Sequence, residues 1–384
     1  MSVIEQSVLD RVRQPVERAL GLPNDCYTDA AYFEWEKKAV FFANWAAIGF
    51  GKDIPKAGDA MPVDFLGMPL LAVRDQDGKI NVFQNTCRHR GMILLEEKAN
   101  LRGVIRCPYH SWCYDLNGDL RMTPHVGGPG NNVHCEIKKP DLGLWDIRSF
   151  VWRDVIFVNV SGDAPSFEEH ASELVKRWKE FEQPVYHAGG DSYFELNIQT
   201  NWKLAVENYC ESYHLPWVHP GLNSYSKLSD HYHIEEPGRF SGQGTLVYSP
   251  MMDESGTRFR EFAGLSDKWD RAGEYIAFFP NVLFGVHRDH AFAIILEPVS
   301  VDRTVEHISL YYASDEMCGD NWGEMRQKNS EMWKEVFVED IFVVEGMQKG
   351  RHGPMFDGGK FSPAMDSPTH VFHHWVADQL RDGG

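Results

Sequence analysis

The sequence predicts an α+β fold in which a domain of antiparallel strands precedes a domain that mixes strands with helices. Short apolar runs such as PLLAV, INVFQ and VIFVNV lie between turn signals such as DQDGK and DLNGD, a pattern typical of antiparallel β structure. Further along, strand-like segments such as AFAIILEPVS and EHISLYYAS occur together with two stretches of helical periodicity. At 384 residues, the chain is long enough for two or three domains.

The order of these patterns divides the chain into three parts. Residues 1–40 are expected to form a helical segment that packs with the last domain, because apolar residues recur there at three- and four-residue steps. Residues 41–160 hold the antiparallel strands, and the segment SGDAPSFEEH that follows is typical of a linker. Residues 161–384 are expected to form the α+β domain, with helices around residues 202–214 and 322–348.

Composition excludes several classes of partner. Lysine and arginine number 38 against 56 aspartate and glutamate residues, which gives a formal charge of −18. Nucleic acid and anionic membrane both require a basic face, so neither is expected as a partner. No apolar run approaches the roughly 18 residues of a membrane span, and the N-terminus lacks the features of a secretory signal. We therefore expect a cytoplasmic protein, in which the seven cysteines indicate metal binding rather than disulfides.

Two short segments of the β domain carry the most specific pattern in the chain. Cys87 and His89 form a C-x-H pair, and Cys107 and His110 form a C-x-x-H pair further along. Two thiolates and two imidazoles suit either a tetrahedral zinc ion or a [2Fe–2S] cluster in which cysteines hold one iron and histidines the other. One cysteine and one histidine on each of two loops would let the loops clamp opposite ends of a cluster. The spacing therefore favours the cluster.

The segments TCRHRG and CPYHSW resemble the two ligand loops of a Rieske domain. The resemblance implies that Cys87, His89, Cys107 and His110 hold a [2Fe–2S] cluster that relays electrons. One departure is that the residue after the second histidine, usually glycine, is Ser111 here, which should alter the hydrogen bonds of the loop rather than ligation. A structural zinc site or four unrelated buried residues are the alternatives.

A stretch of the α+β domain places two histidines close to a proline. NWKLAVENYCESYH has the periodicity of a helix that reaches His214, and Pro216 disfavours helical geometry at Leu215. On a continuous helix His214 and His219 would point roughly 140° apart, because each residue turns by about 100°. With the chain broken at the proline, the two side chains can turn toward one another and share a metal. A pair of hydrogen-bonded core histidines is the alternative.

A mononuclear non-haem iron site needs a carboxylate beside two histidines. In EMWKEVFVEDIFVVEGMQKG, Asp340 shares the apolar stripe of the helix with Trp333 and Phe337. A carboxylate on such a stripe should be paired or coordinated, because burying it alone is expensive. Asp340 is therefore the predicted third ligand, with Glu339 and Asp357 as alternatives.

The chain resembles the Rieske non-haem iron oxygenases over nearly its whole length, since a Rieske domain is followed by D/E-x-x-H-x4-H and a late aspartate. The resemblance implies a helix-grip-like catalytic domain that binds iron through His214, His219 and Asp340. It also implies that Glu211 links a Rieske histidine of a neighbouring subunit to an iron histidine, as in a homotrimer. The chain has no convincing dinucleotide fingerprint, so a separate flavin or iron–sulfur reductase is the expected partner that oxidises NAD(P)H.

Glutamate at position 211 resembles the variant found in members that act on quaternary ammonium compounds such as choline, betaine, stachydrine and carnitine. The expected reaction is O2-dependent hydroxylation of an N-methyl group of a betaine-like compound, leading to N-demethylation. The alternatives are hydroxylation or O- or N-demethylation of an aromatic acid, and a Rieske electron-transfer protein without catalysis. Glu207 and Asn208 are expected to support the site. The aromatic residues either contact substrate or pack the core, and the candidate contacts are Tyr209, Tyr213, Trp217, Phe278, Phe284 and His287.

Overall fold

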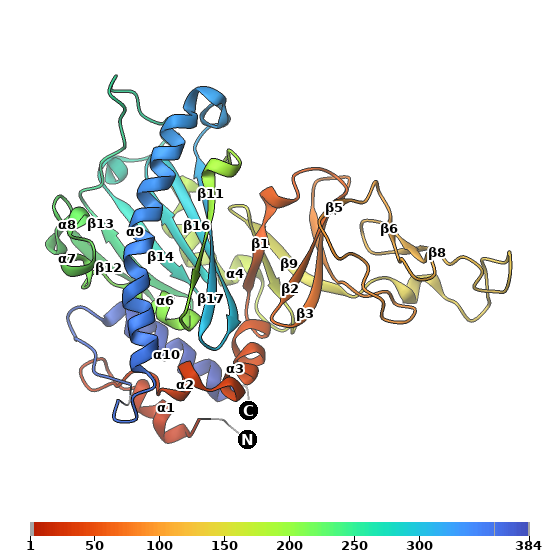
Figure 1. Cartoon of the computed structure of the whole chain (residues 1–384), viewed down its shortest axis with the longest axis horizontal. Coiled ribbons are helices and arrows are strands. Elements are labelled where there is room, and N and C mark those ends of the chain that lie inside the picture. The colour runs from red at the N-terminus through yellow and green to blue at the C-terminus, as the bar shows by residue number, and fades with distance from the viewer. Residues whose placement is uncertain (1–3, 357, 383–384) are drawn as a thin grey trace. The chain divides into compact units, whose positions relative to one another are not determined.

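The computed structural model describes residues 4–356 and 358–382. The chain forms two compact units (Figure 1). One contains the described residues up to Ala46 together with those from Pro165 onward, and the other is Ala47–Ala164. Within these described residues, no helix combines the length and the apolar character that crossing a membrane requires.

The smaller unit consists mainly of antiparallel strands, as the sequence predicts. Its strands are β1 Ala46–Phe50, β2 Asp59–Phe65, β3 Met68–Arg74, β4 Ile80–Gln84, β5 Ala99–Asn100, β6 Ile105–Arg106, β7 Cys113–Tyr114, β8 Leu120–Met122, β9 Asp146–Trp152 and β10 Val155–Asn159, with 3₁₀ turns at η2 Gly51–Asp53 and η3 Lys139–Leu142. The main sheet has the order β1-β10-β9-β4-β3-β2-β5, and β6, β7 and β8 form a second sheet. One hydrophobic core joins Leu71 and Phe83 of the main sheet to Cys87, Cys107 and Trp112. The two cysteine–histidine loops are therefore anchored on the sheet.

The larger unit contains a second sheet of seven strands. These strands are β11 Tyr193–Ile198, β12 His231–Glu236, β13 Phe240–Thr245, β14 Gly273–Phe278, β15 Val282–Val286, β16 His290–Ser300 and β17 Arg303–Tyr312. They lie in the order β11-β17-β16-β15-β14-β13-β12, and each neighbouring pair is antiparallel. Strands β12 to β17 are thus a meander, and β11 is added at its edge beside β17.

Helices pack on this sheet, which confirms the predicted helix-on-antiparallel-sheet fold. Helix α6 (Trp202–Cys210) contacts β13 and β14, α9 (Gly323–Gly350) contacts β11, and α10 (Ser367–Asp382) contacts β12 and β13. Figure 1 shows the long α9 crossing in front of the strands. The shorter helices are α4 Phe167–His170, α5 Ser172–Arg177, α7 Leu215–Val218 and α8 Pro220–Asn223, and the 3₁₀ turns are η4 Lys179–Phe181, η5 Gly190–Ser192, η6 Leu228–Asp230, η7 Asp267–Asp270, η8 Asp315–Cys318 and η9 Asp320–Trp322.

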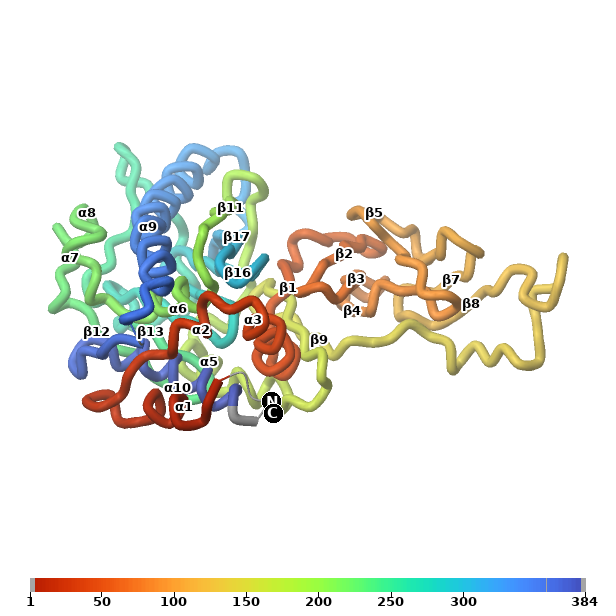
Figure 2. The backbone as a smooth tube through the Cα atoms, turned by 60° about the horizontal axis from the view of Figure 1, so that its bottom comes forward, coloured from red at the N-terminus to blue at the C-terminus, as the bar shows by residue number. Residues whose placement is uncertain are grey.

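The N-terminal segment packs against the C-terminal helix of the same unit. It comprises α1 Gln6–Val12, α2 Asp25–Thr28, α3 Ala30–Glu36 and the π-helical η1 Lys37–Phe42. Helix α1 and η1 both contact α10, and Figure 2 shows these red and blue segments close together. At the contact with α6, Glu36 and Lys203 form a fully buried ion pair of 2.6 Å.

Candidate active site

Helix α6 ends four residues before the expected boundary. Its last residue is Cys210, and Glu211 has an extended backbone with φ −127° and ψ 161°. The Glu211 carboxylate accepts hydrogen bonds from the backbone N–H groups of Tyr213 and His214, so the side chain replaces the helical acceptors of these two groups. The prediction that Pro216 breaks the helix is wrong, because the break occurs at Glu211 and Pro216 lies in the first turn of a new helix, α7.

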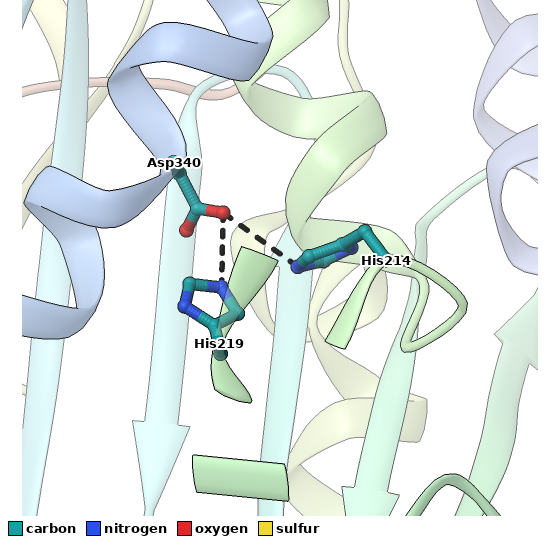
Figure 3. A group of neighbouring side chains, drawn as sticks. All are labelled: His214, His219 and Asp340. Atoms are coloured by element: carbon teal, nitrogen blue, oxygen red, sulfur yellow. Dashed lines mark ion pairs between the residues drawn. The ribbon is translucent and has the colours of Figure 1, made fainter. Parts of the chain in front are cut away.

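This change of direction brings His214 and His219 together with Asp340 of α9, as Figure 3 shows. The Asp340 Oδ1 atom lies 3.6 Å from His214 Nε2 and 3.0 Å from His219 Nε2. One ligand atom from each of the three residues lies within 4.8 Å of the other two. Asp340 Oδ1 is buried and makes no hydrogen bond with the described residues. Two imidazoles and an unsatisfied carboxylate oxygen are a donor set that fits mononuclear iron.

A second carboxylate holds the other nitrogen of each histidine. His214 Nδ1 lies 2.8 Å from Glu211 Oε1, and His219 Nδ1 lies 2.7 Å from Glu339 Oε2. A carboxylate that binds the Nδ1–H group leaves the Nε2 lone pair available for a metal. Glu339 therefore lies on the Nδ1 side of His219, opposite Asp340, and the other alternative, Asp357, lies outside the described residues.

The carboxylates that contact His219 also set the pKa of its ring. Burial lowers the pKa of His219, but the nearby carboxylates of Asp340 and Glu339 outweigh burial and raise the pKa above its usual value. The cluster therefore attracts positive charge at the Nε2 end, where Asp340 lies. A divalent cation would supply that charge and displace the proton.

The two predicted supporting residues lie on different sides of α6. Asn208 lines a pocket together with His214 and Asp340. Glu207 instead accepts a hydrogen bond of 2.5 Å from Tyr27 of the N-terminal segment. Its carboxylate also lies 3.2 Å from His373 and 3.6 Å from Arg351. Burial opposes the charge of Glu207, but His373 and Arg351 lower its pKa, so Glu207 fixes α6 to the rest of the unit.

The pocket beside the triad has a volume of about 250 Å³ and is rich in aromatic residues. Of the predicted substrate contacts, Tyr209 lines it. Tyr213 and Trp217 are exposed and pack against each other, with ring centroids 5.7 Å apart. The aromatic residues that line it are Tyr209, Tyr225, Tyr248, Tyr275, Trp333 and Phe337.

The other predicted contacts lie behind the pocket. Phe278 and Phe284 are buried against Phe167 and Trp178, respectively, and His287 is buried behind Tyr275, whose hydroxyl lies 3.0 Å from His287 Nε2. The strand register explains the difference, because Phe278 lies three positions after Tyr275 and Phe284 pairs with Ile276. Alternation therefore places Phe278 and Phe284 on the face of the sheet opposite Tyr275, and this signal is already present in the sequence.

Trp333 and Phe337 share the helical stripe of Asp340, whereas Tyr225 and Tyr248 lie outside the named helices and strands, where no periodicity indicates their direction.

The smaller unit brings its four predicted ligands into two equivalent loops. The backbone N–H groups of Cys87 and Cys107 each donate 2.8 Å bonds, to Met92 O and Trp112 O, respectively. His89 and His110 lie side by side, with ring centroids 4.7 Å apart. Burial raises the pKa of the Cys87 thiol, and the neighbouring Cys107 raises it further. Adjacent thiols and adjacent imidazoles fit the two ends of a [2Fe–2S] cluster, and His110 Nδ1 is buried without a hydrogen-bond partner among the described residues.

The turn after each ligand pair has the same backbone form. Gly91 N donates 3.0 Å to Cys87 O, and Ser111 N donates 3.0 Å to Cys107 O. Both residues are left-handed, with φ +72° at Gly91 and φ +56° at Ser111. The serine therefore occupies a conformation that glycine adopts without strain, while the hydrogen bond of the turn is retained.

Comparisons with known proteins agree with this geometry. Residues 44–139 match the Rieske [2Fe-2S] domain, and residues 175–382 match the ring hydroxylating alpha subunit (catalytic domain). The chain is 26% identical to the carnitine monooxygenase oxygenase subunit of Acinetobacter pittii over 91% of this chain and 90% of that protein. It is also 26% identical to the chloroplastic choline monooxygenase of Arabidopsis thaliana, over 96% and 84% of the two chains.

Solved structures show the same fold. A quaternary ammonium Rieske monooxygenase superposes with a TM-score of 0.77 at 22% identity, covering 97% of this chain and 98% of that one. Naphthalene 1,2-dioxygenase from Rhodococcus sp. superposes with a TM-score of 0.74 at 18% identity, covering 98% of each chain. The match to the catalytic domain spans more than half of the residues of this chain, and the match to the Rieske domain precedes it. The chain therefore belongs to the ring hydroxylating alpha subunits of the Rieske oxygenases.

Proposed function

We propose that this enzyme is the oxygenase component of a monooxygenase that hydroxylates an N-methyl group of a small quaternary ammonium compound. One oxygen atom of O2 enters the methyl C–H bond, and the other leaves as water after two electrons and two protons are taken up. The resulting N-hydroxymethyl group breaks down to formaldehyde and a tertiary amine, so the net outcome is N-demethylation. The names of the carnitine and choline monooxygenases support this substrate class.

The observation that carries the proposal is that the His214, His219 and Asp340 triad faces a pocket lined by aromatic residues. We assign mononuclear iron to the triad and the [2Fe–2S] cluster to Cys87, His89, Cys107 and His110; when bound, the iron activates O2 and the cluster supplies electrons singly. In the pocket, aromatic faces hold a trimethylammonium group by cation–π attraction. Glu211 and Glu339 keep the two imidazoles oriented through their Nδ1 atoms.

Electrons are expected to reach the iron from a neighbouring subunit. Glu211 lies beside His214 and is mostly buried, but 14% of its side chain is exposed, which leaves it reachable by a partner's Rieske histidine. A related quaternary ammonium monooxygenase is described with inter-subunit electron transfer, and we infer a homotrimer with the same route. A separate reductase would oxidise NAD(P)H, and we place the system in the cytoplasm because that compartment keeps thiols reduced.

The test is metal analysis followed by a substrate screen. The purified enzyme should contain iron for one [2Fe–2S] cluster and one mononuclear site per chain, and Asp340→Ala should lose only the iron that chelators remove. With a surrogate reductase, quaternary amines should release formaldehyde in step with O2 uptake. If the wild-type enzyme holds only cluster iron, the triad is not an iron site. If aromatic acids alone are oxidised, the alternative substrate class is correct.

A further inference from the structure

We propose that Asp289, buried behind Tyr248, is the counter-charge for the substrate's ammonium group, and that the pocket therefore selects a monocation over a zwitterion. This inference rests on the proposed function, because it assumes a quaternary ammonium compound in the pocket beside the triad. The expected substrates are then quaternary ammonium compounds that carry no charged group besides the ammonium.

Asp289 is a buried carboxylate with few partners. Only 1% of the residue is exposed. Its Oδ1 atom accepts hydrogen bonds from the Tyr248 hydroxyl at 2.7 Å and from His290 Nδ1 at 2.9 Å. Its Oδ2 atom has no hydrogen-bond partner among the described residues. A buried charge is costly unless it is paired, so a positive partner is expected close to Asp289.

The neighbouring histidine does not supply that positive charge. Trp333 Nε1 donates a 2.8 Å hydrogen bond to His290 Nε2. An indole N–H is only a donor, so Nε2 must carry a lone pair and the single ring proton is on Nδ1, facing Asp289. His290 is therefore neutral. His287 stacks on it with centroids 4.5 Å apart, and burial lowers the pKa of His287 well below its usual value, so this ring is neutral as well.

The adjacent arginine is engaged elsewhere. Arg288 pairs with Glu261 at 2.5 Å and with Asp270 at 2.9 Å. The only ion-pair geometry of Asp289 among the described residues is with His290. Burial raises the pKa of Asp289, but its contacts with His290 and Tyr248 outweigh burial and lower the pKa below its usual value. The carboxylate is therefore ionised, although no lysine or arginine of the described residues pairs with it.

Tyr248 connects this charge to the pocket. Tyr248, Tyr275 and Trp333 all line it, together with the iron triad. A phenol that donates to a carboxylate is polarised by it, which makes the ring face more attractive to a cation. An ammonium group against Tyr248 would also be attracted by the negative charge of Asp289, which is screened weakly because the carboxylate is buried.

The rest of the pocket offers nothing to pair with a substrate carboxylate. Among the described residues that line it there is no lysine or arginine. His231 is hydrogen bonded through both ring nitrogens, to Ser226 and Gln243, and burial lowers its pKa. Asn329 contributes an uncharged amide donor, whose Nδ2 atom is buried beside the Tyr312 hydroxyl. An uncharged donor suits a hydroxyl or carbonyl oxygen, whereas a carboxylate would also meet repulsion from Asp289.

Three probes of similar size separate the effect of the ammonium charge on binding from the effects of a substrate carboxylate and of shape. Choline is a monocation with a hydroxyl group, glycine betaine is a zwitterion, and 3,3-dimethyl-1-butanol is the uncharged carbon analogue of choline. Calorimetry on the iron-loaded enzyme without reductase measures binding alone. We expect choline to bind about tenfold or more tightly than either of the other probes.

Asp289→Asn keeps the shape of the side chain and removes its charge. It should weaken choline binding about tenfold and leave binding of 3,3-dimethyl-1-butanol unchanged. Asp267→Asn removes the same charge from an exposed position and should alter neither. Tyr248→Phe, which removes the connecting hydroxyl, should act in the same direction as Asp289→Asn and provides a second variant if Asp289→Asn does not fold.

The proposal is overturned if glycine betaine binds as tightly as choline, if Asp289→Asn and Tyr248→Phe leave choline binding unchanged, or if they weaken all probes equally. The last result would indicate a structural role. Failure of the proposed function is a different result: the wild-type enzyme would then bind none of the quaternary amines and would bind or oxidise aromatic acids instead.

Discussion

At the residue scale, each iron-site histidine is held by its own glutamate. Glu211 binds His214 Nδ1 and Glu339 binds His219 Nδ1 at nearly the same distance. The two contacts are thus matched in geometry, but Glu211 is also the residue assigned to the electron route. Amide substitutions should therefore separate metal binding from electron transfer.

We expect Glu339→Gln to weaken iron binding about 10- to 100-fold, because it removes the carboxylate that orients His219 and raises its basicity. Glu211→Gln should weaken iron binding to a similar or smaller extent and, in iron-loaded protein, should slow reduction of the mononuclear site severely. Chelator competition measures the first effect, and single-turnover rapid mixing measures the second. Equal electron-transfer rates in the two iron-loaded variants would contradict the role of Glu211.

Ser111 is a strained residue in one of the two loops that we propose to bind the cluster. At a φ of +56°, any residue with a Cβ atom is strained, whereas glycine is not. Ser111→Gly should therefore stabilise the protein. The gain should not exceed about 1 kcal/mol, because the greater freedom of glycine in the unfolded chain offsets part of the relieved strain. Gly91→Ser, at the equivalent position of the other loop, should destabilise it by about 1 kcal/mol. Thermal unfolding of the cluster-loaded proteins measures both, and a lower melting temperature for Ser111→Gly would contradict the assignment of strain.

At the scale of elements, a buried ion pair joins α3 to α6. Lys203 and Glu36 are both fully buried. Glu36 also accepts hydrogen bonds from Trp202 Nε1 at 2.9 Å and from the Tyr32 hydroxyl at 3.0 Å. The pair fixes the N-terminal segment to the helix that leads into the iron site, so its loss should affect stability.

Lys203→Met should destabilise the protein by about 3–5 kcal/mol, because it leaves the Glu36 carboxylate buried without a cation. The double variant Glu36→Gln/Lys203→Met should be more stable than Lys203→Met alone, because no charge is left unpaired. Lys37→Met, which breaks the more exposed pair with Glu34, should cost no more than about 1 kcal/mol. Urea unfolding with an unchanged m value measures all three. A double variant less stable than Lys203→Met would contradict this explanation.

At the scale of the whole molecule, the two metal centres belong to separate compact units of the chain. The proposed cluster ligands lie in Ala47–Ala164, and the proposed iron triad lies in the unit that begins again at Pro165. If electrons pass between subunits, each centre of one chain works with the complementary centre of another. Defects in the two centres should then complement each other.

Cys107→Ser, which lacks a cluster ligand, and His214→Ala, which lacks an iron ligand, should each be inactive alone. Mixed trimers, obtained by co-expression of the two variants and purification through both tags, should have about one third of the wild-type activity per chain, because one of the three interfaces in a mixed cyclic trimer joins an intact cluster to an intact iron site. Oxygen uptake coupled to formaldehyde release measures the activity. Mixed assemblies that are inactive would show that transfer occurs within one chain.

The sequence by itself determined the features that depend on short-range spacing. Donors a few residues apart, such as Cys87 with His89 or His214 with His219, are placed together by any local turn, so their residue types indicate the metal directly. Strand alternation in the β domain and the long helix that carries Asp340 follow from equally local patterns.

Helical periodicity already places Asp340 and Glu339 about 100° apart. Only the tertiary structure decided which of the two carboxylates faces the histidine Nε2 atoms, because that depends on how α9 packs on the sheet. It also decided the pocket walls, which combine residues from α6, β14 and α9 with Tyr248, far apart in sequence. The buried pair of Asp289 and Tyr248 depends on the same packing. Short-range spacing is set by covalent geometry, whereas contacts between distant segments are set by the burial of apolar surface over the whole unit.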